Sequence, residues 1–324
     1  MAYYYSILDD YSKQLYDLIF DGINKLEKKI YMPPTARNIA FSAFNSVLYD
    51  NPILFYTRAF RYSNTHLLGL QSVLSPVYKY KEELINQSAD VISDYLRLFD
   101  IVKEKSDLEK ELFVHDHCLD NFKYDHDFHE HAFSALGPVM YDTGVCEGIS
   151  KFVKLALNYL GVDCIVVAGD AIRPGDNSRN TEKHMWNIVY INGVTYNLDV
   201  TFDLTQKSSV NRYDFFNLPD SQIKNSHKSA GLAPVCNTEG HDYYTLNRQI
   251  VKGFSGAEKY IENELLAGNN NIVFKLQGGR NDSSDTDKII SIAHGQHQKL
   301  INRSGSVNVR PNLKQGVFEV EFLT

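Results

Sequence analysis

The feature that most constrains the fold is the dipeptide Asn192-Gly193, which lies between two apolar runs. Asn-Gly is the strongest short signal for a β-hairpin, because both residues tolerate the positive φ angles of a type I′ turn. The runs His184–Ile191 and Val194–Val200 are therefore predicted to form antiparallel strands. In this register Ile191 pairs with Val194, which places residues 184, 186, 199 and 201 on one face of the sheet.

This predicted face carries groups that can do chemistry. Asp199 is the diagonal cross-strand neighbour of His184, with Cβ atoms about 7–8 Å apart or somewhat less. Such a separation suits an imidazole that donates its Nδ1–H to a carboxylate, which then fixes the tautomer of the ring. Trp186 shares the face and is expected to shield the pair from water. Asp203 has the same parity and stays an alternative partner for His184.

A second motif precedes the hairpin, where Gly144-Val-Cys146-Glu-Gly148 opens an amphipathic helix that is predicted to end at Gly161. A cysteine in the first turn of a helix lies near unpaired backbone N–H groups and the positive end of the helix dipole, both of which stabilise a thiolate. The thiolate form is the nucleophile. For the cysteine taken alone, close packing of a helix rich in small residues is the competing explanation.

Taken together, the motifs resemble the transglutaminase-like superfamily of cysteine peptidases and acyltransferases, in a bacterial-type member. The resemblance covers about residues 105–220 and is carried by Gly144-Val-Cys146-Glu-Gly148, Leu160-Gly161-Val162, His184-x-Trp186-Asn187 and Leu198-Asp199-Val200. By this resemblance Cys146 is the nucleophile, His184 the base and Asp199 the group that orients the base. The fold that it implies is a papain-like core.

The sequence departs from the family in the group that completes the oxyanion hole. Many members supply a Trp or Gln side chain upstream of the cysteine, but no Trp precedes Cys146. The backbone N–H of Cys146 would be one donor to the oxyanion. Tyr141 or a group from the N-terminal segment is a candidate for the second donor. Glu147 and Trp186 are also expected to line the site.

A stretch rich in His and Asp upstream of Cys146 offers a metal site as a competing interpretation. His115 and Cys118 are three residues apart on a predicted helix, which is acceptable spacing for metal ligands. No consistent tetrahedral set emerges from the stretch, so neither a metal nor another cofactor is predicted. The remaining cysteines, Cys164 and Cys236, are expected, like Cys118, to be buried thiols without a function.

The length of 324 residues allows two or three domains. We expect an α+β protein with a catalytic core over 101–235, flanked by small α/β modules over 1–100 and 236–324. Both flanking segments have the predicted order helix, strand, helix, strand, strand, which is consistent with duplication but is also a common order. The net charge of −7 argues against binding of nucleic acid through its phosphates. No apolar run approaches the length of a membrane span.

The expected reaction is acyl transfer on peptide or Gln amide carbonyls through a thioester, with a peptidase or amidase as first choice. A protein-crosslinking transglutaminase is the runner-up, and a non-catalytic binding module on the same scaffold is the alternative from another class. A protein or peptide substrate is the expected partner, and the sequence predicts no oligomeric state. The absence of a visible signal peptide favours the cytoplasm, with an extracellular location open if a signal was removed.

Overall fold

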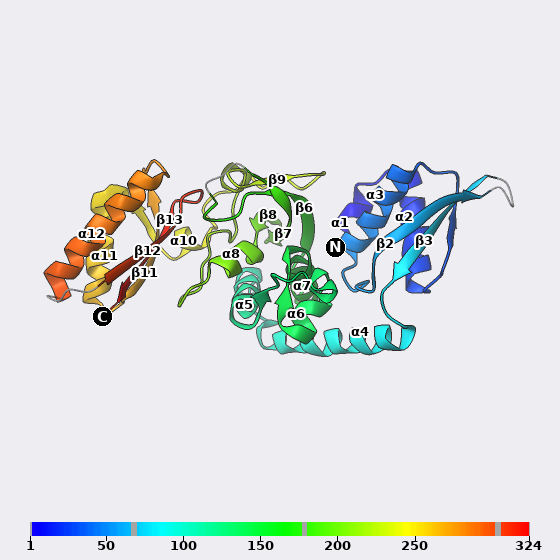
Figure 1. Ribbon diagram of the computed structural model, residues 1–324, viewed down its shortest axis with the longest axis horizontal. Coiled ribbons are helices and arrows are strands. Elements are labelled where there is room, and N and C mark those ends of the chain that lie inside the picture. The colour runs from blue at the N-terminus through cyan, green and yellow to red at the C-terminus, as the bar shows by residue number, and fades with distance from the viewer. Residues whose placement is uncertain (1, 66–69, 177–179, 302–305, 324) are drawn as a thin grey trace. The chain divides into compact units, whose positions relative to one another are not determined.

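The computed structural model describes residues 2–65, 70–176, 180–301 and 306–323, and it is an α+β protein (Figure 1). The chain divides into two compact units. Unit 1 comprises Met1–Val167 and Met185–Gly193, and unit 2 comprises Ala168–His184 and Val194–Thr324. The predicted boundaries at residues 100 and 235 stay predictions. None of the helices in the described ranges combines the length and the apolar character needed to cross a membrane.

Unit 1 contains the elements from α1 to α7. They are α1 (Tyr3–Ser6), α2 (Asp10–Asn24), β1 (Ile30–Met32), α3 (Arg37–Asp50), β2 (Thr57–Thr65), β3 (Gln71–Tyr78), α4 (Glu82–Leu96), η1 (Arg97–Val102), α5 (Asp107–Asn121), β4 (Lys123–Tyr124), η2 (Glu130–Phe133), α6 (Leu136–Tyr141), β5 (Thr143–Gly144) and α7 (Cys146–Tyr159). The division between the units passes through β6 (Cys164–Ala171) and β7 (Glu182–Ile191).

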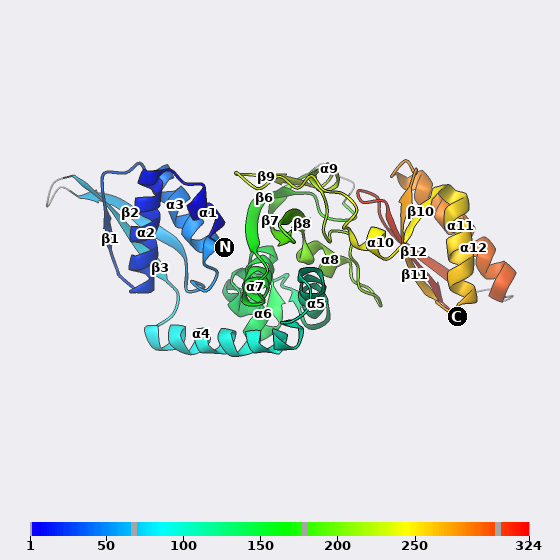
Figure 2. The same ribbon diagram turned by 180° about the vertical axis from the view of Figure 1, so that it is seen from behind.

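Unit 2 contains the later elements. They are β8 (Val194–Leu198), α8 (Val200–Gln206), α9 (Asp220–Ile223), β9 (His227–Ser229), α10 (Tyr243–Leu246), β10 (Ile250–Lys252), α11 (Gly253–Leu266), β11 (Asn271–Gln277), α12 (Ser283–Ile301), β12 (Ser306–Asn312) and β13 (Val317–Leu323). Helices α11 and α12 lie side by side over the sheet of β10 to β13 (Figure 2).

The two ends of the chain repeat one pattern of elements and strand pairing. The order α2, β1, α3, β2, β3 forms an antiparallel sheet with strand order β1-β3-β2. The order α11, β11, α12, β12, β13 forms the antiparallel arrangement β11-β13-β12, to which β10 adds a parallel edge strand. The predicted order of elements in both flanking segments is therefore confirmed, and their strand topology is the same.

Helix α7 is the apolar centre of the middle segment. The residues predicted to form its apolar stripe are buried, among them Ile149, Phe152 and Leu157. Burial also includes a residue outside this apolar stripe, Lys154. Its Nζ donates a hydrogen bond to the carbonyl oxygen of Cys164 at 2.7 Å. The helix ends as predicted, with Gly161 at φ +82°, a conformation that favours glycine.

The predicted hairpin forms, but its second strand is shorter than expected. Asn192 and Gly193 have φ angles of +51° and +79°, as a type I′ turn requires. Strand β8 ends at Leu198 instead of Val200, because Asp199 is the N-cap of α8 and its side chain accepts a hydrogen bond from the backbone N–H of Phe202 at 3.0 Å. Thr201 lies in α8, so the prediction that it shares the sheet face of His184 is wrong.

Candidate active site

Cys146 is the first residue of α7, as the sequence predicts, and its side chain is half-buried in unit 1. The residue before it is held in place, since the Val145 N–H donates to the carbonyl oxygen of Ala132 at 3.0 Å. Gly148 packs against the same carbonyl, and a Cβ added there would lie 2.1 Å from that oxygen. A glycine at 148 is thus required for the helix to begin so close to the preceding loop.

Two polar side chains join α7 to β7 within unit 1. The Ser150 hydroxyl donates to the carbonyl oxygen of Met185 at 3.0 Å. The Asn187 amide donates to the carbonyl oxygens of Ser150 and Ile165, at 3.0 and 3.1 Å. Ser150 lies one turn beyond Cys146 on α7, and Met185 directly follows His184 in the chain. These bonds join α7 to the part of β7 that belongs to unit 1.

Glu147, which was expected to line the site, takes part in an ion-pair cluster within unit 1. Its carboxylate binds Arg58 Nη2 at 2.9 Å and Lys151 Nζ at 2.7 Å. Burial would raise the pKa of Glu147, but the two cations outweigh it and hold the pKa below its ordinary value. The Arg58 guanidinium also lies 4.1 Å from the ring centroid of Phe133. Strand β2 is thereby attached beside the nucleophile candidate.

His184 and Asp199 are in contact within unit 2. The Nε2 atom of His184 lies 2.7 Å from Oδ2 of Asp199, and the two residues are 4% and 1% exposed. The expectation that Nδ1 faces the carboxylate is therefore wrong. The ring is oriented by Phe202, which stacks on it at a centroid distance of 4.2 Å. With Nε2 turned to Asp199, exchange of a proton with a reacting group would be the task of Nδ1.

Asp199 also binds a second histidine that the sequence analysis missed. The Nε2 atom of His227 lies 2.9 Å from the same Oδ2 atom. Burial would raise the pKa of Asp199, but the two imidazoles outweigh it and hold the pKa of the carboxyl well below its usual range. His227 reaches this position because β9 pairs with β6, where it lies opposite Ala171. No local sequence pattern marks such a long-range pairing.

Asp203, the alternative partner, is fully buried on α8. Its Oδ1 atom accepts a hydrogen bond from the backbone N–H of Phe215 at 3.1 Å. The carboxylate thus ties α8 to the segment that follows it. This contact gives Asp203 a structural task that is distinct from the one at Asp199.

The other residues expected to line the site have different surroundings. Trp186 is buried in β7, at 3% exposure. Tyr141 ends α6, is half exposed, and stacks on His131 with ring centroids 4.0 Å apart. Their roles in shielding the site and in binding the oxyanion stay predictions.

Two groups of described residues have the geometry to hold a metal ion, since their ligand atoms lie within 4.8 Å of one another. One consists of His184, Asp199 and His227. The other consists of Asp125, His129 and His131, which belong to the stretch for which the sequence predicts no metal. In the second group the Asp125 carboxylate lies 2.9 Å from Nδ1 of His129.

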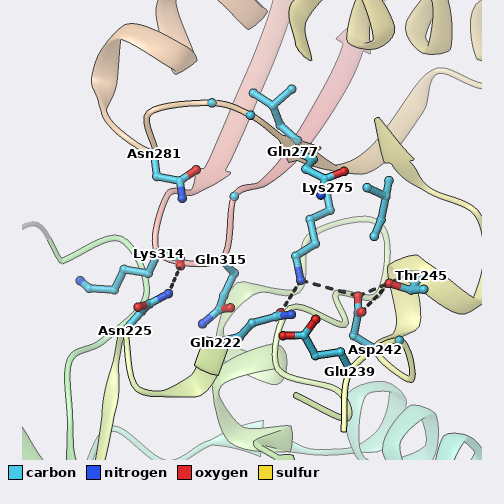
Figure 3. A pocket seen from close by; sticks show the side chains of 16 residues that line it. Gln222, Asn225, Glu239, Asp242, Thr245, Lys275, Gln277, Asn281, Lys314 and Gln315 are labelled. Carbon is cyan, nitrogen blue, oxygen red and sulfur yellow. Dashed lines mark hydrogen bonds and ion pairs between the residues drawn. The ribbon is translucent and has the colours of Figure 1, made fainter. Parts of the chain in front are cut away.

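A polar pocket of about 580 Å³ lies elsewhere in unit 2 (Figure 3). Lys275 projects into it and is bound there by its neighbours, with Nζ 2.7 Å from Oε1 of Gln222 and 3.6 Å from Oδ1 of Asp242. Neither His184 nor Asp199 lines this pocket. The second lysine that lines the pocket, Lys314, donates from Nζ to the carbonyl oxygen of Asp176 at 2.6 Å.

Comparisons with solved structures give weak likenesses. One structure described as a TGase is 14% identical, with a TM-score of 0.34, and the match covers 60% of this chain and 52% of that one. A candidate cysteine protease from Cytophaga hutchinsonii is 13% identical, with a TM-score of 0.27 over 53% of this chain and 65% of that one. A candidate protease from Parabacteroides distasonis is 13% identical, with a TM-score of 0.29 over 61% and 42%. At these TM-scores the likenesses carry no argument about function.

The comparison with family models identifies one segment. No curated protein matches the chain. Residues 98–199 match the model of the transglutaminase-like superfamily, and this segment contains Cys146, His184 and Asp199. It overlaps most of the range for which the sequence motifs indicated the same family. The family that this segment resembles is therefore the transglutaminase-like superfamily.

Proposed function

We propose that the protein catalyses cysteine-dependent acyl transfer on peptide or Gln amide carbonyls, as a peptidase or amidase. The observation that carries the proposal is the buried contact between His184 and Asp199 at 2.7 Å, inside the segment that matches the transglutaminase-like superfamily. A histidine held by a buried carboxylate is the arrangement that activates a neighbouring nucleophile. Cys146, at the start of α7 in the same segment, is the nucleophile in this proposal.

The first half-reaction forms a thioester. His184 Nδ1 takes the proton of the Cys146 thiol, and Asp199 stabilises the resulting imidazolium through Nε2–H. The sulfur attacks the carbonyl carbon, and the backbone N–H of Cys146 donates to the oxyanion. When the tetrahedral intermediate collapses, the C–N bond breaks, and His184 gives its proton to the leaving amine or ammonia.

The second half-reaction restores the enzyme. His184 takes a proton from water, whose oxygen attacks the thioester carbonyl, and the C–S bond breaks to release a carboxylic acid. The thiolate then recovers the proton from the imidazolium. If a primary amine attacks in place of water, the product is a new amide and the same residues act as a transglutaminase.

The hydrogen bonds between α7 and β7 support the assignment of Cys146 to this imidazole. Ser150 follows Cys146 by four residues, so both lie on one face of the helix. Its hydroxyl binds the carbonyl of Met185, the residue next to His184. The face of α7 that carries the Cys146 thiol is thus hydrogen-bonded to Met185, the residue that follows His184 in the chain.

The test is to incubate the protein with a mixture of Gln-containing and amide-capped peptides, with and without a primary amine. The proposal predicts release of ammonia or an amine and a matching new carboxylate, detected by mass spectrometry, with both lost in Cys146→Ala and His184→Ala. Incorporation of the added amine would support the crosslinking alternative. Binding of peptides without turnover would refute acyl transfer in favour of a binding module. Turnover that persists in Cys146→Ala would also refute the proposal.

A further inference from the structure

We infer that His227 is a positioning residue for the base His184 and acts on it through their shared partner Asp199. This inference rests on the proposed function, because it assigns His184 and Asp199 the tasks described above. It starts from one oxygen atom, Oδ2 of Asp199, which lies 2.7 Å from Nε2 of His184 and 2.9 Å from Nε2 of His227.

The partners of His227 exclude it as the base. Its Nε2 atom faces Asp199, and its Nδ1 atom lies 2.8 Å from the hydroxyl of Ser226. Both ring nitrogens are therefore engaged in hydrogen bonds. The side chain is 1% exposed, and its backbone is held in β9 by pairing with β6. His227 can bind and orient Asp199, but it has no nitrogen available for a thiol or a substrate.

Proton accounting sets the tautomers of both histidines. An ionised carboxylate only accepts hydrogen bonds, so each imidazole must carry its proton on Nε2. This places the lone pair of a neutral His184 on Nδ1, which is the state required of the base. A second donor on Oδ2 and the Phe202 N–H on Oδ1 together hold the carboxylate plane. The side-chain torsion of an aspartate is otherwise broad.

The first experiment measures this hydrogen-bond network without relying on activity. Proton NMR of the full chain, labelled with ¹⁵N at histidine, should show the Nε2–H protons of His184 and His227 far downfield, as expected for bonds to a buried carboxylate. His227→Leu should remove one signal and move the other upfield. His227→Gln, which keeps an N–H donor, should leave the His184 signal near its original position. An unchanged His184 signal in His227→Leu would overturn the inference.

The second experiment measures the rate at which an electrophilic amide-directed probe modifies Cys146. His227→Leu should lower this rate about 10-fold to 100-fold, the range expected for loss of a hydrogen bond to a buried charge. His227→Gln should stay within about 3-fold of the parent, because it restores the donor. His297→Leu is the matched control, since His297 is also buried in unit 2 but stacks on Phe322. This control should leave the rate unchanged.

A double-mutant cycle tests whether His227 acts through Asp199. In an Asp199→Asn background, His227→Leu should cause little further loss, because the group through which it acts has already been changed. Full additivity of the two substitutions would overturn the inference. If Cys146 does not react in the parent protein, the proposed function fails, yet the NMR experiment still decides whether His227 orients the His184–Asp199 pair.

Discussion

Replacing Gly148 by alanine should weaken the start of α7, although alanine is the better helix former. The added Cβ would lie 2.1 Å from the carbonyl oxygen of Ala132, and ordinary contact begins at 3.4 Å. The neighbour must therefore retreat by about 1.3 Å. Because this neighbour is backbone, no side-chain rotation relieves the overlap. The same carbonyl accepts the hydrogen bond from Val145, so its displacement also disturbs the residue before Cys146.

The net effect follows from two opposing terms. Overpacking of a buried site costs about 1–3 kcal/mol, and contact with rigid backbone places this case near the upper end. Exchange of glycine for alanine in a helix returns up to about 1 kcal/mol. We expect the free energy of unfolding to fall by about 2 kcal/mol. A misplacement of the nucleophile by about 1 Å should also lower its reaction rate about 100-fold.

The assay uses Trp186, the only tryptophan of the chain, which is buried in β7. Its fluorescence during urea unfolding reports the region where α7 and β7 are joined. Gly295→Ala is the matched control, because Gly295 lies within α12 and nothing lies within 4 Å of its added Cβ. Gly148→Ala should lower the urea midpoint, and Gly295→Ala should not. A Gly148→Ala protein as stable as its parent would refute the close approach to Ala132.

Three further results are expected. Arg212→Met should cost about 3–5 kcal/mol in urea unfolding, because it leaves the buried Asp214 carboxylate without its cation and removes one of the two arginines that pair with the buried Glu319. Arg310→Met removes a partly exposed cation, and Glu319 keeps its ion pair with Arg212, so this change should cost at most about 1 kcal/mol. Asp199→Asn should slow the reaction of the probe with Cys146 by about 10²–10³-fold, which is less than the roughly 10⁴-fold effect in serine proteases. Asp203→Asn keeps the hydrogen bond from the Phe215 backbone and should slow this reaction less. If Asp203→Asn slowed the reaction more than Asp199→Asn, Asp199 would not be the orienting group. Burial lowers the pKa of His227 below the ordinary 6.5, so the unfolded chain binds more protons than the folded one and the free energy of unfolding should fall as pH drops below 6.5. His227→Gln should make the free energy of unfolding less dependent on pH in this range. An equal pH dependence in the variant and the parent would show that His227 is not buried as a neutral imidazole.

Local sequence patterns predicted the elements that carry the candidate site. The Asn192-Gly193 turn and the glycine end of α7 follow from backbone preferences of single residues, and both form as expected. The end of β8 was predicted wrongly, because an aspartate after a strand can either continue the strand or cap a helix. At Asp199 the cap prevails, since its side chain binds the N–H of Phe202.

Contacts between distant segments could not be predicted in this way. Arg58 reaches Glu147 from 89 residues away, and His227 reaches Asp199 from 28 residues away. Both contacts depend on how strands and loops that are distant in the sequence pack together, and no periodic pattern in the sequence indicates such packing. The choice of Nε2 over Nδ1 at His184 has the same origin, because it depends on the stacking of the ring on Phe202 and on the position of the N-cap.

The most direct test of the central claim is whether His184 controls the reactivity of Cys146. Faster modification of Cys146 than of Cys118, Cys164 and Cys236 is not sufficient, because these three thiols are fully buried. The decisive measurement is the rate of Cys146 adduct formation by mass spectrometry in the parent protein and in His184→Ala. The account predicts a fall of about 100-fold or more, the contribution of a general base. Equal rates in the two proteins would contradict it.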